Sequence, residues 1–354
     1  MAEGNILVHA NALESYATSL LAAAGLTDED AAFTAHALVQ TNLWGIDSHG
    51  VLRLPLYVKR LRNGAMNPRP HIQPVRGALA LQVIDGDDGP GFIVGREAMR
   101  KAIAIAEQFN VGVVGAIRSN HFGATGLYAR LAAERGMVGI AMTNVVPNMV
   151  APGGGKPITG NNPIAIAIPT FADFPFVLDM SLSAVAGGKL LLASKQGVKI
   201  PLDWATDRDG RPTDDPDKAF AGSLLPMAGF KGLGLSYAVD ILCGLITGGA
   251  FGDAMKGMYT HPNEPSQTGH MMIAINLAAI ISEDEMREKM RAFYTSLKNS
   301  PMWDSSAEMF MPGEIEYRLA QKRQAEGIPL PAQLYAEMEA LGAELGIPDA
   351  LARA

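Results

Sequence analysis

The sequence predicts a fold of the α+β class that is not a Rossmann fold. Helical periodicity marks both ends of the chain, from residue 11 to 61 and again from residue 282 onward, and short apolar runs typical of strands lie between them. The one glycine cluster that resembles a phosphate loop is GDDGPGFIVG, residues 86–95. Its glycine spacing does not match G-x-G-x-x-G, and its aspartates would repel a pyrophosphate.

The composition is typical of a compact globular protein. The 354 residues leave room for two domains, and apolar residues make up 48% of them against 18% charged. The formal net charge of −7 argues against nucleic acid as a partner, because phosphates need a basic surface. The only cysteine, Cys243, rules out an internal disulfide and suits the reducing cytoplasm, and its apolar neighbours predict a buried position.

Nothing in the sequence predicts a membrane protein. The first residues lack the basic start and apolar run of a signal peptide. The apolar stretch at 232–251 has Asp240 near its middle, which would cost roughly 3 kcal/mol in lipid. We therefore expect a buried core helix at 232–251, in a cytoplasmic protein with no membrane partner.

The first part of the chain is expected to be helical. Residues 11–24 form one amphipathic helix, which Gly25 ends, and Thr27 with Asp30 resembles a capping box that opens a second helix as far as Gly45. Helical periodicity then continues to residue 61. A proline-containing extended linker follows.

The central and last parts alternate between strands and helices. Strands are predicted at 79–85, 111–119, 137–144, 163–169, 174–181 and 271–280. Helices are predicted at 96–109 and 127–135. Another is predicted over the segment that contains Lys189 and Lys195, which Ser181 or Ser183 can cap. Later helices are predicted to begin at Gly229, to run from a Ser282 cap to Lys298, and to form twice near the end of the chain.

The stretch GIDSHGVLR, residues 45–53, gathers the side chains of an acid-binding site. Ser48 can cap a helix, in which His49 and Arg53 would stand four residues apart on one face. Histidine titrates near neutrality and arginine grips a carboxylate with two parallel hydrogen bonds. The alternative is a structural cap followed by a surface arginine. Pro55 would fall in the second turn, so the helix either kinks there or begins later.

Two further side chains lie where strands end. His121 follows the strand at 111–119 in the loop NHFGATG, whose glycines permit close approach to a ligand, so it is either catalytic or structural. Asp179 ends another strand and either contacts a ligand or caps the next helix.

Two lysines stand on helices, and one of them suits an anion. Lys231 opens a glycine-flanked helix, where free N–H groups attract negative charge, and Lys189 lies on the helix after Asp179. GGGK at 153–156 is not a Walker A loop, because Val150 and Pro157 occupy two of its required positions. We find no cysteine or histidine spacing suited to zinc and predict no metal site.

A series of motifs in one order resembles the type 2 malate/L-lactate dehydrogenase family. The matching segments span nearly the whole chain: GIDSHGVLR, the DG…GPG…G..AM run at 85–99, SNHFG, P…M.APGGG…G.NP, DMS.S..A.GK, IP.DWATD..G.PT.DP, GFKG.GL…D.L.G and MPGE. Trp44 departs from the arginine that many relatives carry before GIDSHG, and Asn161 departs from the usual threonine.

This resemblance implies a fold and an activity. It implies a mixed, largely antiparallel sheet carrying the cofactor at 76–257, packed with a helical part built from both chain ends, 1–75 and 258–354. The implied activity is hydride transfer between NAD or NADP and a small 2-hydroxy or 2-oxo acid. The alternative is a reductase of cyclic imino acids, ureidoglycolate or keto-sugar acids. Family members are usually homodimers with the active site near the subunit interface.

The resemblance also implies residue roles. The family assigns acid/base work to the equivalent of His49 in some members and of His121 in others, and we favour His49 as proton donor, with His121 sharing the site. Arg53 would bind the substrate carboxylate and Ser48 the substrate oxygen. The expected cofactor contacts come from His121, Asn144, Asp179, Met180, Ser181, Lys189, Lys231, Gly313 and Glu314. The remaining histidines are expected at the surface or in packing.

Overall fold

A seven-stranded sheet forms the centre of the computed structural model, which describes residues 4–304, 306–347 and 350–354. The strand order is β2-β3-β4-β12-β5-β8-β9. All neighbours are antiparallel except β3 and β4, so the expected mixed, largely antiparallel sheet is confirmed. The strands are β2 (Gln73–Ala78), β3 (Leu81–Asp85), β4 (Val111–Ser119), β5 (Met137–Thr143), β8 (Ile164–Ile168), β9 (Phe176–Met180) and β12 (Thr268–Asn276).

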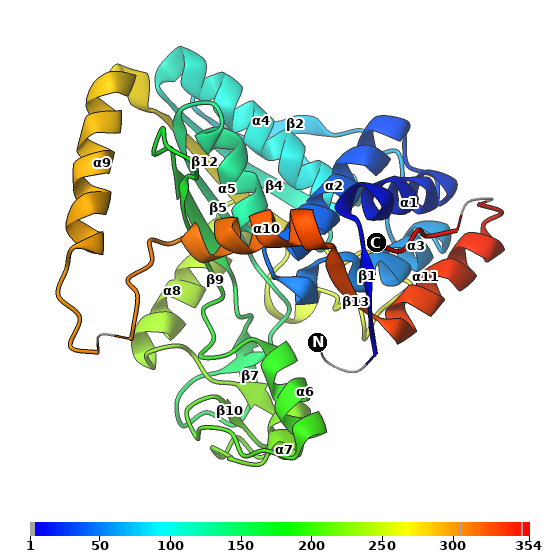
Figure 1. Cartoon of the computed structure of the whole chain (residues 1–354). Helices are drawn as coiled ribbons and strands as arrows, with labels where there is room; N and C mark the ends of the chain where they lie inside the picture. The colour runs from blue at the N-terminus through cyan, green and yellow to red at the C-terminus, as the bar shows by residue number, and fades with distance from the viewer. Residues whose placement is uncertain (1–3, 305, 348–349) are drawn as a thin grey trace.

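Two helices cover one face of this sheet, α4 (Gly91–Phe109) and α5 (Gly126–Ala133) (Figure 1). They approach closely because the sheet presents glycine to them. A Cβ on Gly112 would collide with the carbonyl of Ala102, and a Cβ on Gly139 with that of Ala129. Small residues on the strands therefore set the depth at which the helices pack.

The helical layer is built from both ends of the chain, as the resemblance implied. It contains α1 (Ala10–Ala23), α2 (Asp28–Leu43), α3 (Leu54–Arg62), α10 (Glu314–Glu326) and α11 (Ala332–Glu344). Strands β1 (Asn5–Val8) and β13 (Ile328–Pro331) pair antiparallel and tie the ends together, where blue and red segments meet in Figure 1. A single hydrophobic cluster joins Leu38 and Met338 of this layer to Val114 of the sheet.

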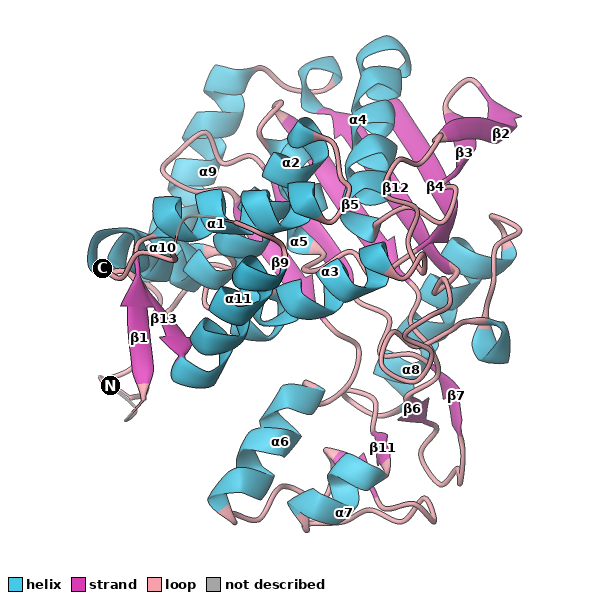
Figure 2. Ribbon diagram, turned by 90° about the vertical axis from the view of Figure 1, so that its right-hand side faces the viewer, coloured by secondary structure: helices cyan, strands magenta, loops and turns pink. Residues whose placement is uncertain are grey.

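A smaller unit lies below the sheet with a core of its own, which includes Val185, Leu190 and Ile200 (Figure 2). Its four-stranded sheet has the order β10-β11-β6-β7. Its elements are β6 (Met149–Val150), β7 (Pro157–Thr159), α6 (Gly187–Gln196), β10 (Ala205–Thr206), α7 (Pro216–Ala221) and β11 (Ser223–Leu224).

Of the remaining helices, one lies on the second face of the central sheet and the other stands apart from it. Helix α8 (Phe230–Asp240) runs into a π-helical turn (Ile241–Leu245) that packs on β12 and β4, and α9 (Glu283–Lys298) stands at the periphery (Figure 1). Cys243 is fully buried, as expected. The expectation of a buried core helix at 232–251 is wrong, because this helix packs by one side only and leaves Ile241 and Leu245 exposed.

Local signals at helix starts had mixed success. Thr27 and Ser282 cap α2 and α9 as predicted. Neither Ser181 nor Ser183 caps α6, which begins after Ala186 without a side-chain cap.

The segment at 73–78, expected as linker, forms β2. No helix in the described ranges has the length and apolar character needed to cross a membrane.

The division at residue 257 remains a proposal about domains. Strand β12 lies beyond it in sequence, yet occupies the middle of the central sheet between β4 and β5. The C-terminal segment therefore contributes a strand to the sheet as well as helices to the layer above it.

Candidate active site

The GIDSHGVLR stretch folds as two short 3-10 turns, Asp47–His49 and Val51–Arg53, followed by α3 from Leu54. Ser48 therefore caps no α-helix, and that prediction is wrong. The later start, which Pro55 left open, is confirmed: proline lacks an N–H and fits the first turn of α3. Gly50 lies against the side chain of Asn42, whose oxygen accepts from the Val51 N–H at 2.8 Å.

The turns bring His49 onto His121. The two rings stack with centroids 5.6 Å apart and an interplanar angle of 23°. The Ser48 hydroxyl lies 2.9 Å from Nδ1 of His49. Neither Nε2 atom hydrogen-bonds to any residue that the structure describes, and neither is a buried unpaired atom. Both are free to meet a ligand.

Arg53 stands beside this pair. Its Nε donates to the Ser48 carbonyl at 2.7 Å, and its Nη1 donates to the Tyr259 hydroxyl at 2.7 Å. Its guanidinium also lies 5.7 Å from the Tyr259 ring centroid. The arrangement holds a fixed cation next to two imidazoles.

His121 is held in place by neighbouring residues that the sequence did not predict as part of the site. Its Nδ1 lies 2.7 Å from the Tyr57 hydroxyl and accepts from the Gly123 N–H at 3.3 Å. The adjacent Asn120 is fully buried. Its Nδ2 donates to the carbonyls of Asp88 and Gly89, at 2.8 and 3.0 Å.

Arg60 completes this support from α3. It is 1% exposed and donates to Oδ1 of Asn120 at 3.1 Å. It also donates to the carbonyls of His261 and Glu264, which follow Tyr259. The spacing of Arg53, Tyr57 and Arg60, four and three residues apart, was a usable signal, because such residues share a helix face.

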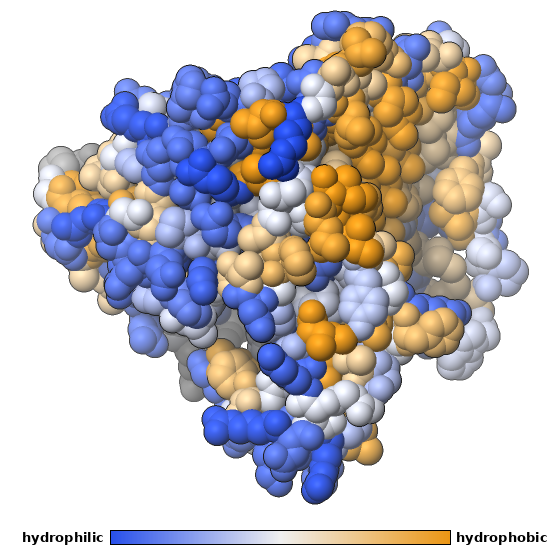
Figure 3. Space-filling model, turned by 180° about the vertical axis from the view of Figure 1, so that it is seen from behind, coloured by the Kyte–Doolittle hydropathy of each residue, from blue (hydrophilic) through white to orange (hydrophobic). Residues whose placement is uncertain are grey.

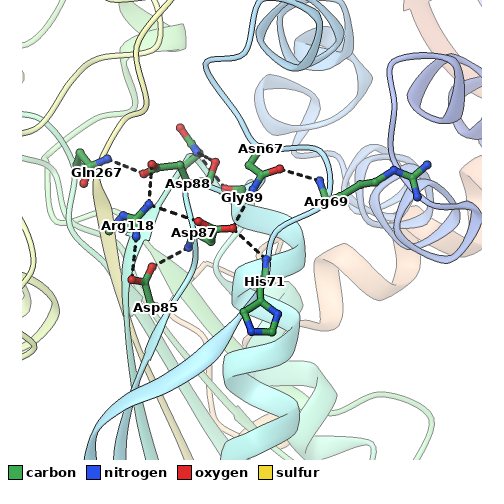
Figure 4. A network of polar contacts seen from close by, with 10 residues as sticks. Asn67, Arg69, His71, Asp85, Asp87, Asp88, Gly89, Arg118 and Gln267 are labelled. Atoms are coloured by element: carbon green, nitrogen blue, oxygen red, sulfur yellow. Dashed lines mark hydrogen bonds and ion pairs between the residues drawn. The ribbon is translucent and has the colours of Figure 1, made fainter.

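The rejected phosphate loop has a structural role instead. Arg118 donates to three carboxylates, those of Asp85 at 2.9 Å, Asp87 at 3.4 Å and Asp88 at 3.0 Å (Figure 4). Gln267 donates to Asp88 at 2.6 Å. The aspartates therefore bind an arginine at the end of β4 and brace the loop that carries His121.

Burial and positive charge keep the site histidines neutral. Burial, followed by repulsion from Arg53, lowers the pKa of His49 to about 4. The same two causes hold the pKa of His121 well below its usual range. Behind them the fully buried His270 stacks on Phe122 at 4.4 Å, and burial lowers its pKa to about 3. It is a packing residue, as expected.

Two of the expected cofactor residues near the sheet, Asn144 and Asp179, form hydrogen bonds within the protein. Asn144 is buried and bonded at both ends of its amide, to the Ala250 carbonyl and the Gly269 N–H, so its side chain ties loops together. Asp179 accepts from the Gly126 N–H at 2.7 Å and so caps α5, not the helix α6 that follows it in sequence. Burial raises the pKa of Asp179 to about 6. Met180 and Ser181 follow it, half-buried.

The two lysines lie at open helix starts. Lys189 is exposed in the first turn of α6, after Gly187 and Gly188, and Lys231 is exposed in the first turn of α8, after Gly229. A Cβ on any of these three glycines would contact nothing within 4 Å. The N-cap residue of neither helix makes a side-chain cap hydrogen bond, and no other described side chain accepts from the first N–H groups of these helices.

Gly313 and Glu314 begin α10 beside β9. Gly313 has a φ of +94°, and a Cβ there would press on the Pro175 carbonyl, so a side chain would be strained. Glu314 is 2% exposed and pairs with Lys298 at 2.7 Å and Arg318 at 2.6 Å. Its carboxylate therefore serves the packing of α9 on α10.

Two cavities lie away from the histidines. One of about 400 Å³ lies between residues 170–174 and α9, with Met311 on its wall. Another of about 480 Å³ lies in the smaller unit, beside Pro152 and Asp203. Across the described ranges, no three histidine, cysteine, aspartate or glutamate side chains gather as a metal site.

The chain matches the family model of malate/L-lactate dehydrogenase over residues 8–339. It is 40% identical over 323 residues to L-sulfolactate dehydrogenase of Methanocaldococcus jannaschii, covering 91% of this chain and 92% of that protein. It is 36% identical over 353 residues to malate dehydrogenase of Pyrococcus horikoshii, covering 98% and 97%. It is 32% identical over 315 residues to ureidoglycolate dehydrogenase (NAD(+)) of Escherichia coli K12, covering 89% and 90%.

Solved structures agree with these matches. The sulfolactate dehydrogenase structure from M. jannaschii superposes with a TM-score of 0.90 at 38% identity, covering 96% of this chain and 98% of that one. The malate dehydrogenase structure from P. horikoshii superposes with a TM-score of 0.89 at 35% identity, covering 98% and 97%. The chain therefore belongs to the malate/L-lactate dehydrogenase family and is an NAD(P)-dependent oxidoreductase of the 2-hydroxy acid class.

Proposed function

We propose that the chain interconverts a 2-oxo acid and its 2-hydroxy acid at the group formed by Ser48, His49, Arg53 and His121. The observation that carries this proposal is the stack of two imidazoles with free Nε2 atoms beside a fixed guanidinium.

The substrate is oriented by charge. Its carboxylate binds Arg53, whose planar group offers parallel donors that a lysine lacks. This places the C2 oxygen at the Nε2 atoms of His49 and His121, with the Ser48 hydroxyl close by. Neutral His49 takes the proton of the C2 hydroxyl at its Nε2 during oxidation, and during reduction its imidazolium form, protonated from solvent, gives a proton to the oxygen.

A bound NAD or NADP supplies the hydride acceptor or donor for this reaction. The residues present fit its diphosphate: α6 and α8 offer glycine-rich starts with open space, and Lys189 and Lys231 add positive charge. Asp179, Met180 and Ser181 at the end of β9, with Gly313 and Glu314 at the start of α10, would hold the rest of the dinucleotide. His121 would then contact both cofactor and substrate.

For the substrate we favour acids with a second anionic group, because the relatives at 40% and 36% identity are a sulfolactate and a malate dehydrogenase. Ureidoglycolate, cyclic imino acids and keto-sugar acids are the alternative. The test is a screen of oxaloacetate, sulfopyruvate, pyruvate and piperideine-2-carboxylate with NADH and NADPH, in which the loss of absorbance of the reduced nicotinamide reports turnover. Absence of turnover with every pair would refute the proposal.

We further propose a cytoplasmic homodimer. The second face of the sheet carries half-buried apolar side chains on alternate positions, among them Ile166, Ile168 and Ile275. The neighbouring turn adds exposed Leu245 and Ile246, and Figure 3 shows this apolar surface from behind. A continuous patch of this kind on a protein surface is typical of a subunit interface.

A further inference from the structure

The contacts of the two site histidines differ in kind. Nδ1 of His49 faces the Ser48 hydroxyl, a group that can donate or accept. Nδ1 of His121 faces the Gly123 backbone N–H, a group that can only donate. A neutral imidazole has one N–H and one lone pair, so this long contact of 3.3 Å favours a lone pair on Nδ1 of His121, and a second donor is needed to confine it there.

The same argument orients the Tyr57 hydroxyl. Since Nδ1 of His121 is an acceptor, the hydroxyl 2.7 Å away donates to it. Tyr57 is 3% exposed and packs edge-on against Phe92 with centroids 5.5 Å apart, so its hydroxyl is held in this direction. Burial raises the pKa of Tyr57, so the hydroxyl keeps its proton and remains a donor.

We propose that Tyr57 is a positioning residue which, with the Gly123 N–H, confines the proton of neutral His121 to Nε2. His121 then presents a hydrogen-bond donor to the substrate's C2 oxygen and has no lone pair there to accept a proton. His49 retains both options at its own Nε2, because the Ser48 hydroxyl can reverse. The two histidines therefore have different roles. His49 exchanges the proton with the substrate's C2 oxygen, and His121 polarises and orients that oxygen.

This division rests on the proposed function, but the tautomer does not. Long-range 1H–15N NMR of histidine-labelled protein reads the protonated ring nitrogen without substrate or cofactor. The His121 signals are assigned as those lost in His121→Gln. We expect the wild-type ring to carry its proton on Nε2 at pH 7. A proton on Nδ1 would overturn the proposal.

Tyr57→Phe tests the tyrosine itself, since it removes the hydroxyl and keeps the ring against Phe92. We expect a mixture of His121 tautomers, and a fall in kcat of about 5- to 10-fold with KM little changed, as for one lost hydrogen bond. Tyr16→Phe is the matched control, because that buried hydroxyl donates to the remote Met338 carbonyl. An unchanged tautomer in Tyr57→Phe would refute the role of Tyr57.

The outcomes separate this inference from the proposed function. If His121 carries its proton on Nε2 and Tyr57→Phe shifts it, while no 2-oxo acid is turned over, the tautomer assignment stands and the proposed function fails. If turnover is found and the tautomer is not as stated, the function stands and the role of Tyr57 fails.

Discussion

The rings of His49 and His121 stack 5.6 Å apart, although one follows α2 and the other follows β4. Arg53 lies next to both and lowers the pKa of each. The candidate site therefore holds two neutral imidazoles beside a cation.

The titration of His49 should depend on Arg53. Burial and the guanidinium lower the pKa of His49 to about 4, and Arg53→Gln removes the second of these causes. We expect the pKa of His49 to rise in Arg53→Gln. An NMR titration of the labelled ring measures it, and an unchanged midpoint would show that burial alone sets the value.

Substrate binding should weaken when Arg53 is lost. A hydrogen bond to a charged group contributes about 1.5–3 kcal/mol, so Arg53→Ala should raise KM for the 2-oxo acid roughly 10- to 100-fold. Binding of NADH or NADPH, read from nicotinamide emission, should be unaffected. Lys59→Ala, an exposed cation on α3, is the control and should keep the wild-type KM.

Turnover should depend on His49. Because we propose that His49 transfers the proton at the C2 oxygen, His49→Ala should lower kcat by about 100-fold or more while cofactor binding is preserved. The exposed His36 provides the control variant, His36→Ala. Normal turnover in His49→Ala would move the proton role to His121 or to water.

Stability should fall in acid because of His270. Its pKa is about 3 in the folded chain against 6.5 when unfolded, so the unfolded state binds more protons below pH 6.5. The stabilisation is complete above pH 6.5 and is lost as the pH falls towards 3. Between pH 6.5 and 5 the loss from His270 amounts to about 2 kcal/mol.

Urea unfolding of the wild type and of His270→Gln at pH 7 and pH 5 measures this loss. The variant should lose less unfolding free energy between the two pH values than the wild type. An equal loss in both would assign the acid sensitivity to other groups, such as His49 and His121, which act in the same direction.

A charged side chain introduced into the apolar face should disrupt the proposed subunit interface. Ile246 is 63% exposed next to the π-helical turn, so Ile246→Glu should fold normally and yet halve the mass seen by light scattering. Phe220→Glu, on α7 of the smaller unit, is the matched control and should remain a dimer. A monomeric wild type would refute the homodimer.

Local sequence patterns anticipated most elements, because periodicity and caps act over a few residues. The strand at 111–119 and the Thr27 and Ser282 caps are examples. Family motifs added the antiparallel character of the sheet and the expected roles of His49, Arg53 and His121. Neither source indicated that Asp85, Asp87 and Asp88 bind Arg118, since ion pairing depends on which loops meet in space.

The chain by itself determined which chemical groups are available: two loop histidines, an arginine beside one of them, and no dinucleotide glycine motif. Only tertiary structure decided that the histidines stack and that Tyr57 and Gly123 both contact one ring nitrogen of His121. It also decided that the helix expected at 232–251 ends at Leu245 and leaves one side exposed. The physical reason is range. Propensity and capping are properties of neighbouring residues, whereas burial, pKa and the direction of a hydrogen bond are set by groups that the fold brings together from distant parts of the chain.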